Sequence, residues 1–304
     1  MTGIKINQIK KIHFQKFLWG FFRFVLIFGL CYVILNPFII KILMSFMGPK
    51  DLLDSTIKLI PKHWSLYYWK YAWGKLDIAN SGMLTMQLSM ISGLIQMLVS
   101  TSVGYGLARF KFKGRNLAFA MVIIMLLIPP QVYSIAQYLG FRYFGFGAVT
   151  ANLIDTVFPV YILSFCCLSI KQGLYIFLLR EFFMGMPKDL ENAAYVDGAS
   201  VFRTFFSVML PNAKTMMITI FLFAFCWQWT DTSFSSLYFS SRVTLALRPM
   251  LGAMTIRTQA RTDIYGTGIA INTATMIVII PLIILAVVCQ KFLVKSISQS
   301  GLAN

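Results

Sequence analysis

The segment PKDLENAAYVDGASVFRTFFSVMLP, from Pro187 to Pro211, is a polar stretch between two long apolar ones. Its five charged residues are Lys188, Asp189, Glu191, Asp197 and Arg203. Charged side chains are costly in the hydrocarbon core of a bilayer, so this segment is expected to connect membrane spans through water. A water-exposed helical elbow of this length indicates a docking surface for a soluble partner.

The composition of the whole chain supports this interpretation. Of its 304 residues, 58% are hydrophobic and 12% are charged, and the mean hydropathy is +0.73. A soluble domain usually carries about 25% charged residues. One globular core cannot bury so much apolar surface, so we predict an all-α integral membrane protein.

Six apolar windows in the sequence reach about 20 residues, the length that crosses a bilayer. They predict six transmembrane helices near Phe17–Leu43, Met83–Leu107, Leu117–Leu139, Leu153–Leu179, Thr215–Leu237 and Gly268–Phe292. Prolines lie within or beside several windows, and membrane helices tolerate such breaks where neighbouring helices satisfy the freed backbone groups. The polar segment then joins the fourth span to the fifth.

Lysines and arginines in the short loops predict the orientation. Residues 1–16 carry four lysines and residues 109–115 carry four basic residues, and neither stretch contains an acid. Basic loops favour the cytoplasm, so both termini and the polar segment are expected there. The predicted organisation is a cytoplasmic segment 1–16, a six-span domain 17–295 with the polar loop at 181–211, and a cytoplasmic tail 296–304. Four arginines in the loop before the sixth span oppose this orientation: Arg242, Arg248, Arg257 and Arg261.

The polar segment has the signals of a helix, a sharp turn and a second helix. Pro187 suits the first position of a helix, and Asp189 and Glu191 complement the helix dipole in its first turn. Gly198 can adopt the left-handed conformation that ends a helix, and Ser200 can cap the next one, which we expect to end at the following proline. Taken alone, these signals are also compatible with a solvated connecting loop.

The spacing within the segment resembles the EAA loop of ABC importer permeases. Ala193-Ala194, three further residues, Gly198 and a later Leu210-Pro211 reproduce that pattern, and LENAAYVDGAS is similar to the form in MalG-like carbohydrate-uptake permeases. The resemblance implies a coupling helix that docks on a cytoplasmic ATPase subunit. The residues it assigns to coupling are Glu191, Asn192, Ala193, Ala194, Asp197, Gly198 and Ala199.

One residue departs from the family pattern. Asn192 stands where the family has the glutamate that names the loop, and Glu191 comes immediately before it. Either Glu191 substitutes for that glutamate or the contact with the ATPase is neutral. Elsewhere the resemblance covers most of the chain; similar motifs lie at 105–115, 128–131, 182–187, 229–231 and 290–295.

The sequence contains no GxxxxGK[ST] motif for nucleotide binding. The resemblance therefore implies that ATP and Mg²⁺ are bound by two partner ATPase subunits, and that this chain has no cofactor of its own. It further implies a heterodimer with a second permease subunit, an extracellular solute-binding protein or lipoprotein, and a place among the lipids of a bacterial cell membrane.

We expect no catalytic residue and no metal site. The five cysteines lie in apolar stretches without CxxC or Cys/His spacing, and His13 is far from His63 in the sequence. The net charge of +17 comes mostly from single basic residues beside apolar windows, so a nucleic-acid partner is not expected.

Polar and aromatic residues at membrane depth are candidates for the path of a sugar. The first group, in the fifth window, is Trp227, Gln228, Trp229 and Asp231, and the second is Gln131, Tyr133 and Asn272. Alternatively, the two tryptophans belong to an interfacial belt and Asp231 lies beyond the headgroups.

Two alternative functions remain open. The first is an ABC permease for another solute, such as a polyamine, phosphate or a glycerol phosphate. The four loop arginines named above suit an anionic cargo. The second is a secondary transporter or channel that works alone, which predicts membrane-embedded charges, and the apolar windows contain few of them.

Overall fold

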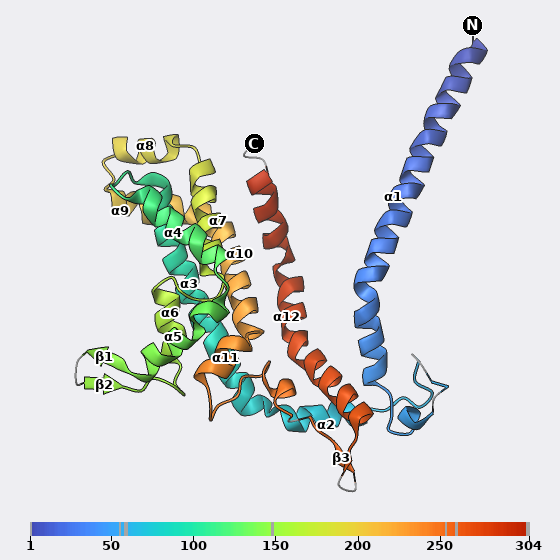
Figure 1. The fold of residues 1–304 in the computed structure, drawn as a ribbon. Helices are drawn as coiled ribbons and strands as arrows, with labels where there is room; N and C mark the ends of the chain where they lie inside the picture. The colour runs from blue at the N-terminus through green and yellow to red at the C-terminus, as the bar shows by residue number, and fades with distance from the viewer. Residues whose placement is uncertain are drawn as a thin grey trace. The chain divides into compact units, whose positions relative to one another are not determined.

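The computed structural model describes residues 2–54, 56–57, 60–146, 149–252, 254–258 and 261–301. Most of these residues are α-helical, as predicted (Figure 1). The α-helices are α1 (Thr2–Ser45), α2 (Tyr67–Leu76), α3 (Met83–Arg109), α4 (Arg115–Leu127), α5 (Pro130–Arg142), α6 (Phe158–Phe165), α7 (Gln172–Gly185), α8 (Asp189–Val196), α9 (Val201–Thr204), α10 (Leu210–Trp229), α11 (Ser233–Tyr238) and α12 (Ile264–Gly301).

Short elements complete the fold. Two antiparallel hairpins, which the sequence did not predict, pair β1 (Phe144–Phe146) with β2 (Val149–Ala151) and β3 (Arg257–Thr258) with β4 (Arg261–Thr262). The π-helical turns are Ile78–Gly82 and Phe205–Met209, and the 3₁₀ turns are Asp51–Leu53 and Arg248–Met250.

The part of the chain that the structure describes has four helical segments long and apolar enough to cross a membrane. They are Lys16–Ser45, Ile78–Arg109, Val201–Trp229 and Ile264–Lys291. A fifth crossing is available if α4 and α5, which meet at 103°, count as one bent span. The predicted windows exceed the number of long helices because some of them are broken.

The breaks have local causes. The third window bends at Pro129, which has extended backbone angles and cannot continue α4, while Pro130 occupies the first turn of α5. The fourth window is divided into α6 and α7, and Cys167 and Lys171 between them have φ of 63° and 58°. The fifth window ends its first helix at Trp229 and resumes in α11.

The chain forms two compact units, residues 1–72 with 255–276, and residues 73–254 with 277–304. In the first unit, the Phe46 ring stacks on Trp69 with centroids 5.6 Å apart. The Asp51 carboxylate accepts a 2.9 Å hydrogen bond from the His63 backbone N–H. Large apolar side chains of α1 between Phe17 and Ile42 are exposed, as expected for a surface that faces lipid or another subunit.

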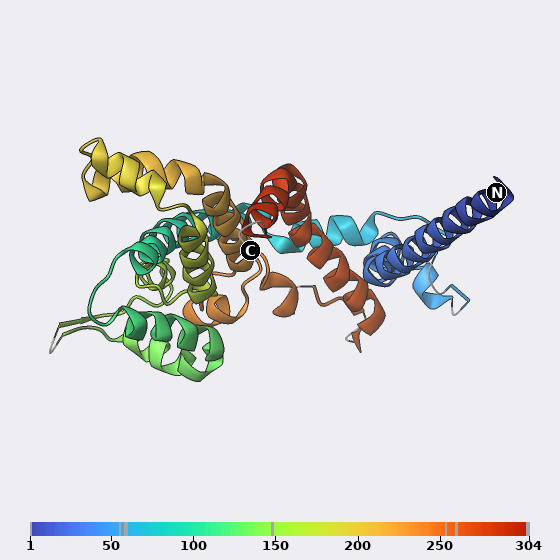
Figure 2. The ribbon, with the colours of Figure 1, turned by 90° about the horizontal axis from the view of Figure 1, so that it is seen from above.

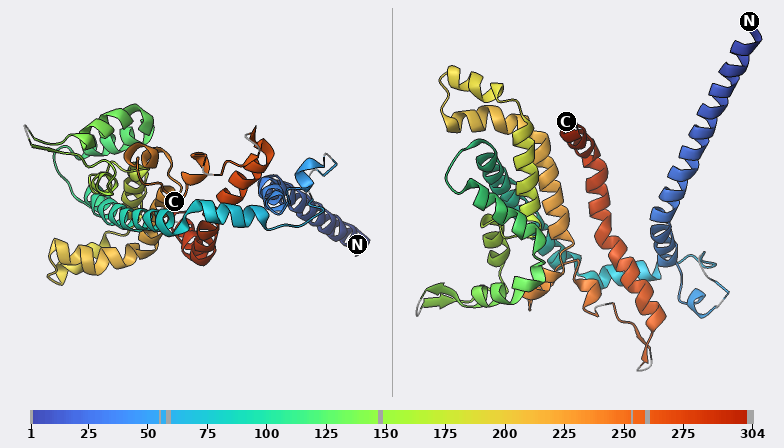
Figure 3. Two further views of the ribbon diagram at one scale, coloured as in Figure 1. Left: turned by 90° about the horizontal axis from the view of Figure 1, so that it is seen from below. Right: turned by 45° about the horizontal axis from the view of Figure 1, so that its top comes forward.

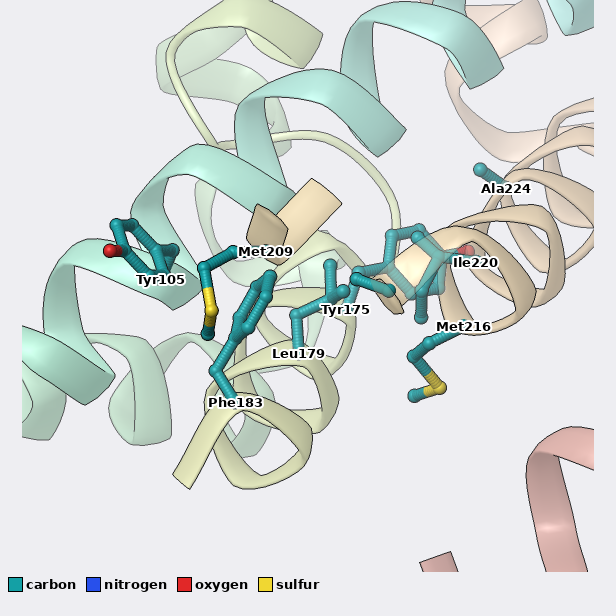
Figure 4. Close-up of a cluster of buried hydrophobic side chains, with 9 residues drawn as sticks. Tyr105, Tyr175, Leu179, Phe183, Met209, Met216, Ile220 and Ala224 are labelled. Atoms are coloured by element: carbon teal, nitrogen blue, oxygen red, sulfur yellow. The ribbon is translucent and has the colours of Figure 1, made fainter. Parts of the chain in front are cut away.

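The second unit is built around α3, which packs along both α7 and α10 (Figures 1 and 3). Small residues allow this close approach. A Cβ at Gly104 would lie 2.9 Å from Leu179 Cβ, and one at Gly93 would lie 3.3 Å from the Phe221 ring. The buried cluster where the three helices meet includes Tyr105, Leu179, Phe183, Met209 and Ile220 (Figure 4).

Candidate functional site

The polar segment folds as the predicted helix, turn and second helix, and we call residues 187–204 the elbow. Helix α8 begins at Asp189 with Lys188 as its N-cap, so Pro187 precedes the helix and does not occupy the first position that we expected. Gly198 has φ of +78°, and its N–H donates to Tyr195 O at 3.0 Å to close the helix end. Ser200 Oγ accepts from the Arg203 N–H at 3.3 Å and caps α9.

The expected break at Pro211 is absent. The π-helical turn Phe205–Met209 connects α9 to α10 without interruption, and Pro211 lies in the first turn of α10. The continuous helix accepts this proline because the π-turn directly before it widens the backbone, with the Leu210 N–H bonded to Phe205 O five residues earlier.

The elbow has an exposed face with both polar and apolar residues. Asn192, Ala193, Asp197 and Gly198 are exposed, Ala199 is half-buried, and Ala194 is buried. Two apolar side chains stand out, because Val196 is 87% and Phe202 is 77% exposed. The elbow lies at one end of the second unit, beyond the cytoplasmic ends predicted for α3 and α7, with α8 alongside the start of the α9–α10 segment (Figures 1 and 2).

Glu191 faces the interior of the same chain. The Tyr105 hydroxyl donates to Glu191 Oε1 at 2.9 Å, and Arg109 Nε lies 3.5 Å from Glu191 Oε2. Arg109 also donates through a second guanidinium nitrogen to Met186 O at 2.7 Å. The four-residue spacing of Tyr105 and Arg109 puts them on one face of α3. No other pattern in the sequence indicates that they meet Glu191.

Most of the fifth-window candidates are engaged within the chain. Trp229 is buried, and its Nε1–H donates to Val278 O at 3.0 Å. Gln228 is also buried. The Asp231 carboxylate accepts hydrogen bonds from the backbone N–H groups of Phe234 (3.1 Å) and Ser235 (2.7 Å), which caps the start of α11.

Trp227 differs from its neighbours, because 47% of the residue is exposed. Lys171 Nζ lies 5.2 Å from the centroid of its ring, within cation–π range. Of the two tryptophans in the fifth window, Trp227 is therefore the one whose ring can still meet a ligand, a lipid or another subunit.

Gln131 lines a cavity of about 340 Å³ between α5 and α11. Three serines contribute hydroxyl groups to the same cavity: Ser134, Ser233 and Ser236. Amide and hydroxyl groups of this kind form hydrogen bonds with neutral polar ligands.

The last two path candidates lie elsewhere. Tyr133 is half-buried and packs against the apolar cluster that contains Phe141 and Tyr238. Asn272, in the first unit, donates through Nδ2 to Lys41 O at 2.9 Å. Whether any of these seven residues contacts a substrate stays a prediction.

A larger cavity of about 680 Å³ lies at the other end of α3 from the elbow. Arg248 is held there by Asp77 Oδ2 (2.7 Å) and Ser81 Oγ (2.7 Å), whereas Arg242 is exposed in the lining. The side chains of Arg257 and Arg261, named above for their charge, lie outside the described residues.

A buried polar seam between α3 and its neighbours was missed in the sequence. Gln96 Nε2 donates to Ser164 Oγ (3.3 Å) and Ser169 Oγ (3.0 Å), and Gln172 Nε2 donates to Ser164 O at 2.7 Å. Such bonds hold membrane helices together. Serines and Gln96 recur at helical spacing in α3, and this periodicity is the signal that could have identified them. In the described part of the chain, no group of three or more His, Cys, Asp or Glu residues could hold a metal ion.

Residues 98–299 match the family model described as "Binding-protein-dependent transport system inner membrane component". The chain belongs to this family. The matched region contains the elbow, α10 and most of α12, so the predicted class, a multi-pass importer permease subunit, is confirmed.

Relatives with known names agree with this class. The chain is 29% identical over 229 residues to the "Probable starch degradation products transport system permease protein AmyC" of Thermoanaerobacterium thermosulfurigenes, covering 75% of this chain and 78% of that protein. It is 26% identical over 268 residues to the "Diacetylchitobiose uptake system permease protein NgcG" of Streptomyces coelicolor, covering 88% and 83%. Both names describe permease proteins of uptake or transport systems.

The fold is similar to that of one chain in a crystal structure of a bacterial ABC transporter involved in the import of the acidic polysaccharide alginate. The TM-score is 0.67 at 21% identity, and the match covers 91% of this chain and 97% of the other. The helical arrangement is therefore that of an ABC importer chain.

Proposed function

We propose that this chain is a permease subunit of a bacterial ABC importer for a sugar or an oligosaccharide. The observation that carries the proposal is the elbow. The family is described as binding-protein-dependent. The elbow of this chain exposes two large apolar side chains, Val196 and Phe202, next to exposed polar residues. Exposed apolar side chains of this size mark an interaction surface.

In this proposal the ATPase subunit docks on the outward face of the elbow. Asn192, Ala193, Asp197, Gly198 and Ala199 form the contact together with the two exposed apolar side chains. Glu191 does not substitute for the family glutamate, because its carboxylate is occupied by Tyr105 and Arg109. The contact with the ATPase is therefore neutral at position 192.

The proposed topology has six crossings, with α4–α5 and α6–α7 each forming one broken span. Both termini and the elbow then lie in the cytoplasm, with segments 1–16 and 296–304 outside the membrane. The complete importer would contain a second permease subunit, two ATPase subunits that bind ATP and Mg²⁺, and an extracellular solute-binding protein. Closure of the ATPase pair would move the elbow as a rigid body.

The carbohydrate cargo is supported by the names of the relatives and by the cavity between α5 and α11. Gln131 and the serines of that cavity offer neutral hydrogen-bonding groups, and Trp227 offers an exposed ring. Sugars need both kinds of contact, because their hydroxyl groups form hydrogen bonds and their C–H faces pack on aromatic rings.

The test is uptake of a labelled oligosaccharide by proteoliposomes that contain the complete importer. We expect uptake to require ATP on the elbow side and the binding protein on the other side. Gly198→Asp should abolish ATP-driven uptake, because the left-handed backbone disfavours a side chain and the new charge enters the docking face. Uptake driven by an ion gradient without ATP would contradict the proposal.

A second candidate, an importer of an anionic solute, is favoured by the exposed Arg242 in the 680 Å³ cavity. In that case an acidic oligosaccharide should compete for uptake better than its methyl ester, and Arg242→Gln should remove the difference. Equal competition by the two compounds would leave the neutral sugar as the cargo.

A further inference from the structure

Helix α8 is tied to α3 by a buried charged group. Glu191 projects from α8 toward the last two turns of α3, where Tyr105 binds one carboxylate oxygen at 2.9 Å and Arg109 lies 3.5 Å from the other. The Glu191 and Arg109 side chains are only 10% and 6% exposed. A buried carboxylate and a buried guanidinium each need the opposite charge nearby, so these two groups hold each other in place.

The same arginine fixes the chain just before α8. Its 2.7 Å hydrogen bond to Met186 O holds the residue that ends α7 and precedes Pro187. Arg109 Nε has no hydrogen-bond partner of its own, so the Glu191 charge is its nearest compensation. One side chain of α3, Arg109, thus contacts both Met186, directly before the elbow, and Glu191 in the first turn of α8.

Aromatic rings enclose this attachment. The Tyr105 ring lies 5.3 Å from Phe183, 5.4 Å from Phe110 and 4.7 Å from Phe205, measured between centroids. In Figure 4 its hydroxyl points away from the apolar cluster, while its ring lies beside Met209 and Phe183. The rings exclude water from the hydroxyl–carboxylate bond, which strengthens that bond and fixes its geometry.

The receiving end of the attachment is rigid. Gly104, directly before Tyr105, brings α3 so close to α7 that an added Cβ would lie 3.1 Å from the Arg180 backbone nitrogen. Further along, the Gln96 bonds to Ser164 and Ser169 fix α3 against neighbouring segments. A displacement at Tyr105 therefore moves α3 with its packed neighbours instead of bending a single side chain.

We propose that Glu191, Tyr105 and Arg109 form a latch that transmits movement of α8 to α3, and that Glu191 is a positioning residue and not an ATPase contact. This proposal rests on the proposed docking of the ATPase at the elbow. A partner that pulls or pushes α8 acts on α3 through the latch, and α3 carries the motion across the membrane. Without the latch, the partner still binds the outer face but moves α8 alone.

The test compares Glu191→Gln and Tyr105→Phe in the complete importer, with Glu181→Gln as the matched control. Glu181 is an exposed acid of α7 whose loss leaves the latch intact. We expect Glu191→Gln to retain the ATPase subunits on purification and to keep basal ATP hydrolysis. Uptake should fall about tenfold, because the variant removes the negative charge that faces Arg109 and turns a charged hydrogen bond from Tyr105 into a weaker neutral one. Tyr105→Phe should act in the same direction because it removes the hydroxyl donor, and the double variant should show less than the product of the two single effects because both residues belong to one cluster.

Hydrogen–deuterium exchange of the α8 amides separates the latch from the docking proposal. Exchange at residues 189–196 should become faster in both latch variants and stay unchanged in Glu181→Gln. Normal uptake in Glu191→Gln, or unchanged exchange in α8, would overturn the latch and leave docking intact. Loss of the ATPase with unchanged exchange would overturn it too, since Glu191 would then be a direct contact. Failure of the wild-type importer to bind an ATPase would instead overturn the proposed function.

Discussion

The elbow and the end of α10 are both polar stretches in apolar surroundings, yet they use their polar residues in opposite ways. In the elbow, one acid turns inward to Tyr105, and Val196 and Phe202 stay exposed. At the end of α10, Trp229 and Asp231 are buried and form hydrogen bonds within the chain, and of the two tryptophans only Trp227 is exposed. The elbow therefore has a surface to offer a partner, whereas the α10 end is mainly part of the scaffold.

The strongest test of this contrast changes the exposed side of the elbow. Val196→Asp combined with Phe202→Asp should lower ATPase binding by a hundredfold or more, roughly 3 kcal/mol, because two large apolar contacts are lost and two charges are desolvated. Co-purification and size-exclusion chromatography of the complex measure it. Met250→Asp is the control, because Met250 is 71% exposed and follows Arg248 at the opposite end of the unit. If both variants bind the ATPase equally well, the elbow is not the docking surface.

The close approach of α3 to α7 is expected to matter for folding. Gly104→Ala should destabilise the chain by about 1–3 kcal/mol, because the new Cβ would overlap Leu179 Cβ and the Arg180 backbone. Gly106→Ala, two residues later, is the matched control, since a Cβ there would meet nothing nearer than Phe110 Cδ2 at 4.0 Å. Thermal unfolding in detergent compares the two variants. Equal melting temperatures would show that α3 and α7 are not tightly packed at Gly104.

If Asp231 is part of the scaffold, removing its carboxylate should affect stability first. Asp231→Ala should cost about 1–2 kcal/mol, the usual range for a lost helix cap, because two backbone N–H groups of α11 lose their acceptor. Thr230→Ala, at the exposed position just before Asp231, serves as the control. Unchanged stability together with a changed substrate preference would contradict this role and indicate that Asp231 lines the substrate path.

The smallest effect is expected at Trp227. Trp227→Ala should leave thermal stability within about 0.5 kcal/mol, as for most exposed substitutions, while uptake falls about threefold if the ring meets the cargo. Phe223 lies one turn earlier on the same face of α10 and is 39% exposed, so Phe223→Ala is the control. Equal uptake in the two variants would make Trp227 a lipid-facing residue.

Local chemistry was enough to predict the shape of the elbow. Gly198 and Ser200 specify a helix end and a helix start through their own backbone preferences, and both features are present. The direction of Glu191 was not predictable in this way. It depends on Tyr105, 86 residues earlier in the chain, and no local pattern encodes that contact.

The broken spans show the same limit. The double proline at 129–130 predicts one bend. The left-handed backbone of Cys167 and Lys171 is not predictable from the sequence, because these residue types rarely adopt that conformation. The hydropathy pattern predicted a single span in the fourth window because α6 and α7 are both apolar. Tertiary packing decides where such a window breaks, and packing partners are distant in the sequence.

The central claim is that the outward face of the elbow contacts an ATPase subunit while Glu191 faces α3. The most direct measurement places a photo-crosslinking amino acid at position 192, 196 or 202 of the intact, transport-active importer. We predict a covalent product with the ATPase from each of these positions and none from position 250, which is exposed at the opposite end of the unit. An active importer that gives no ATPase product from positions 192, 196 and 202 would contradict it.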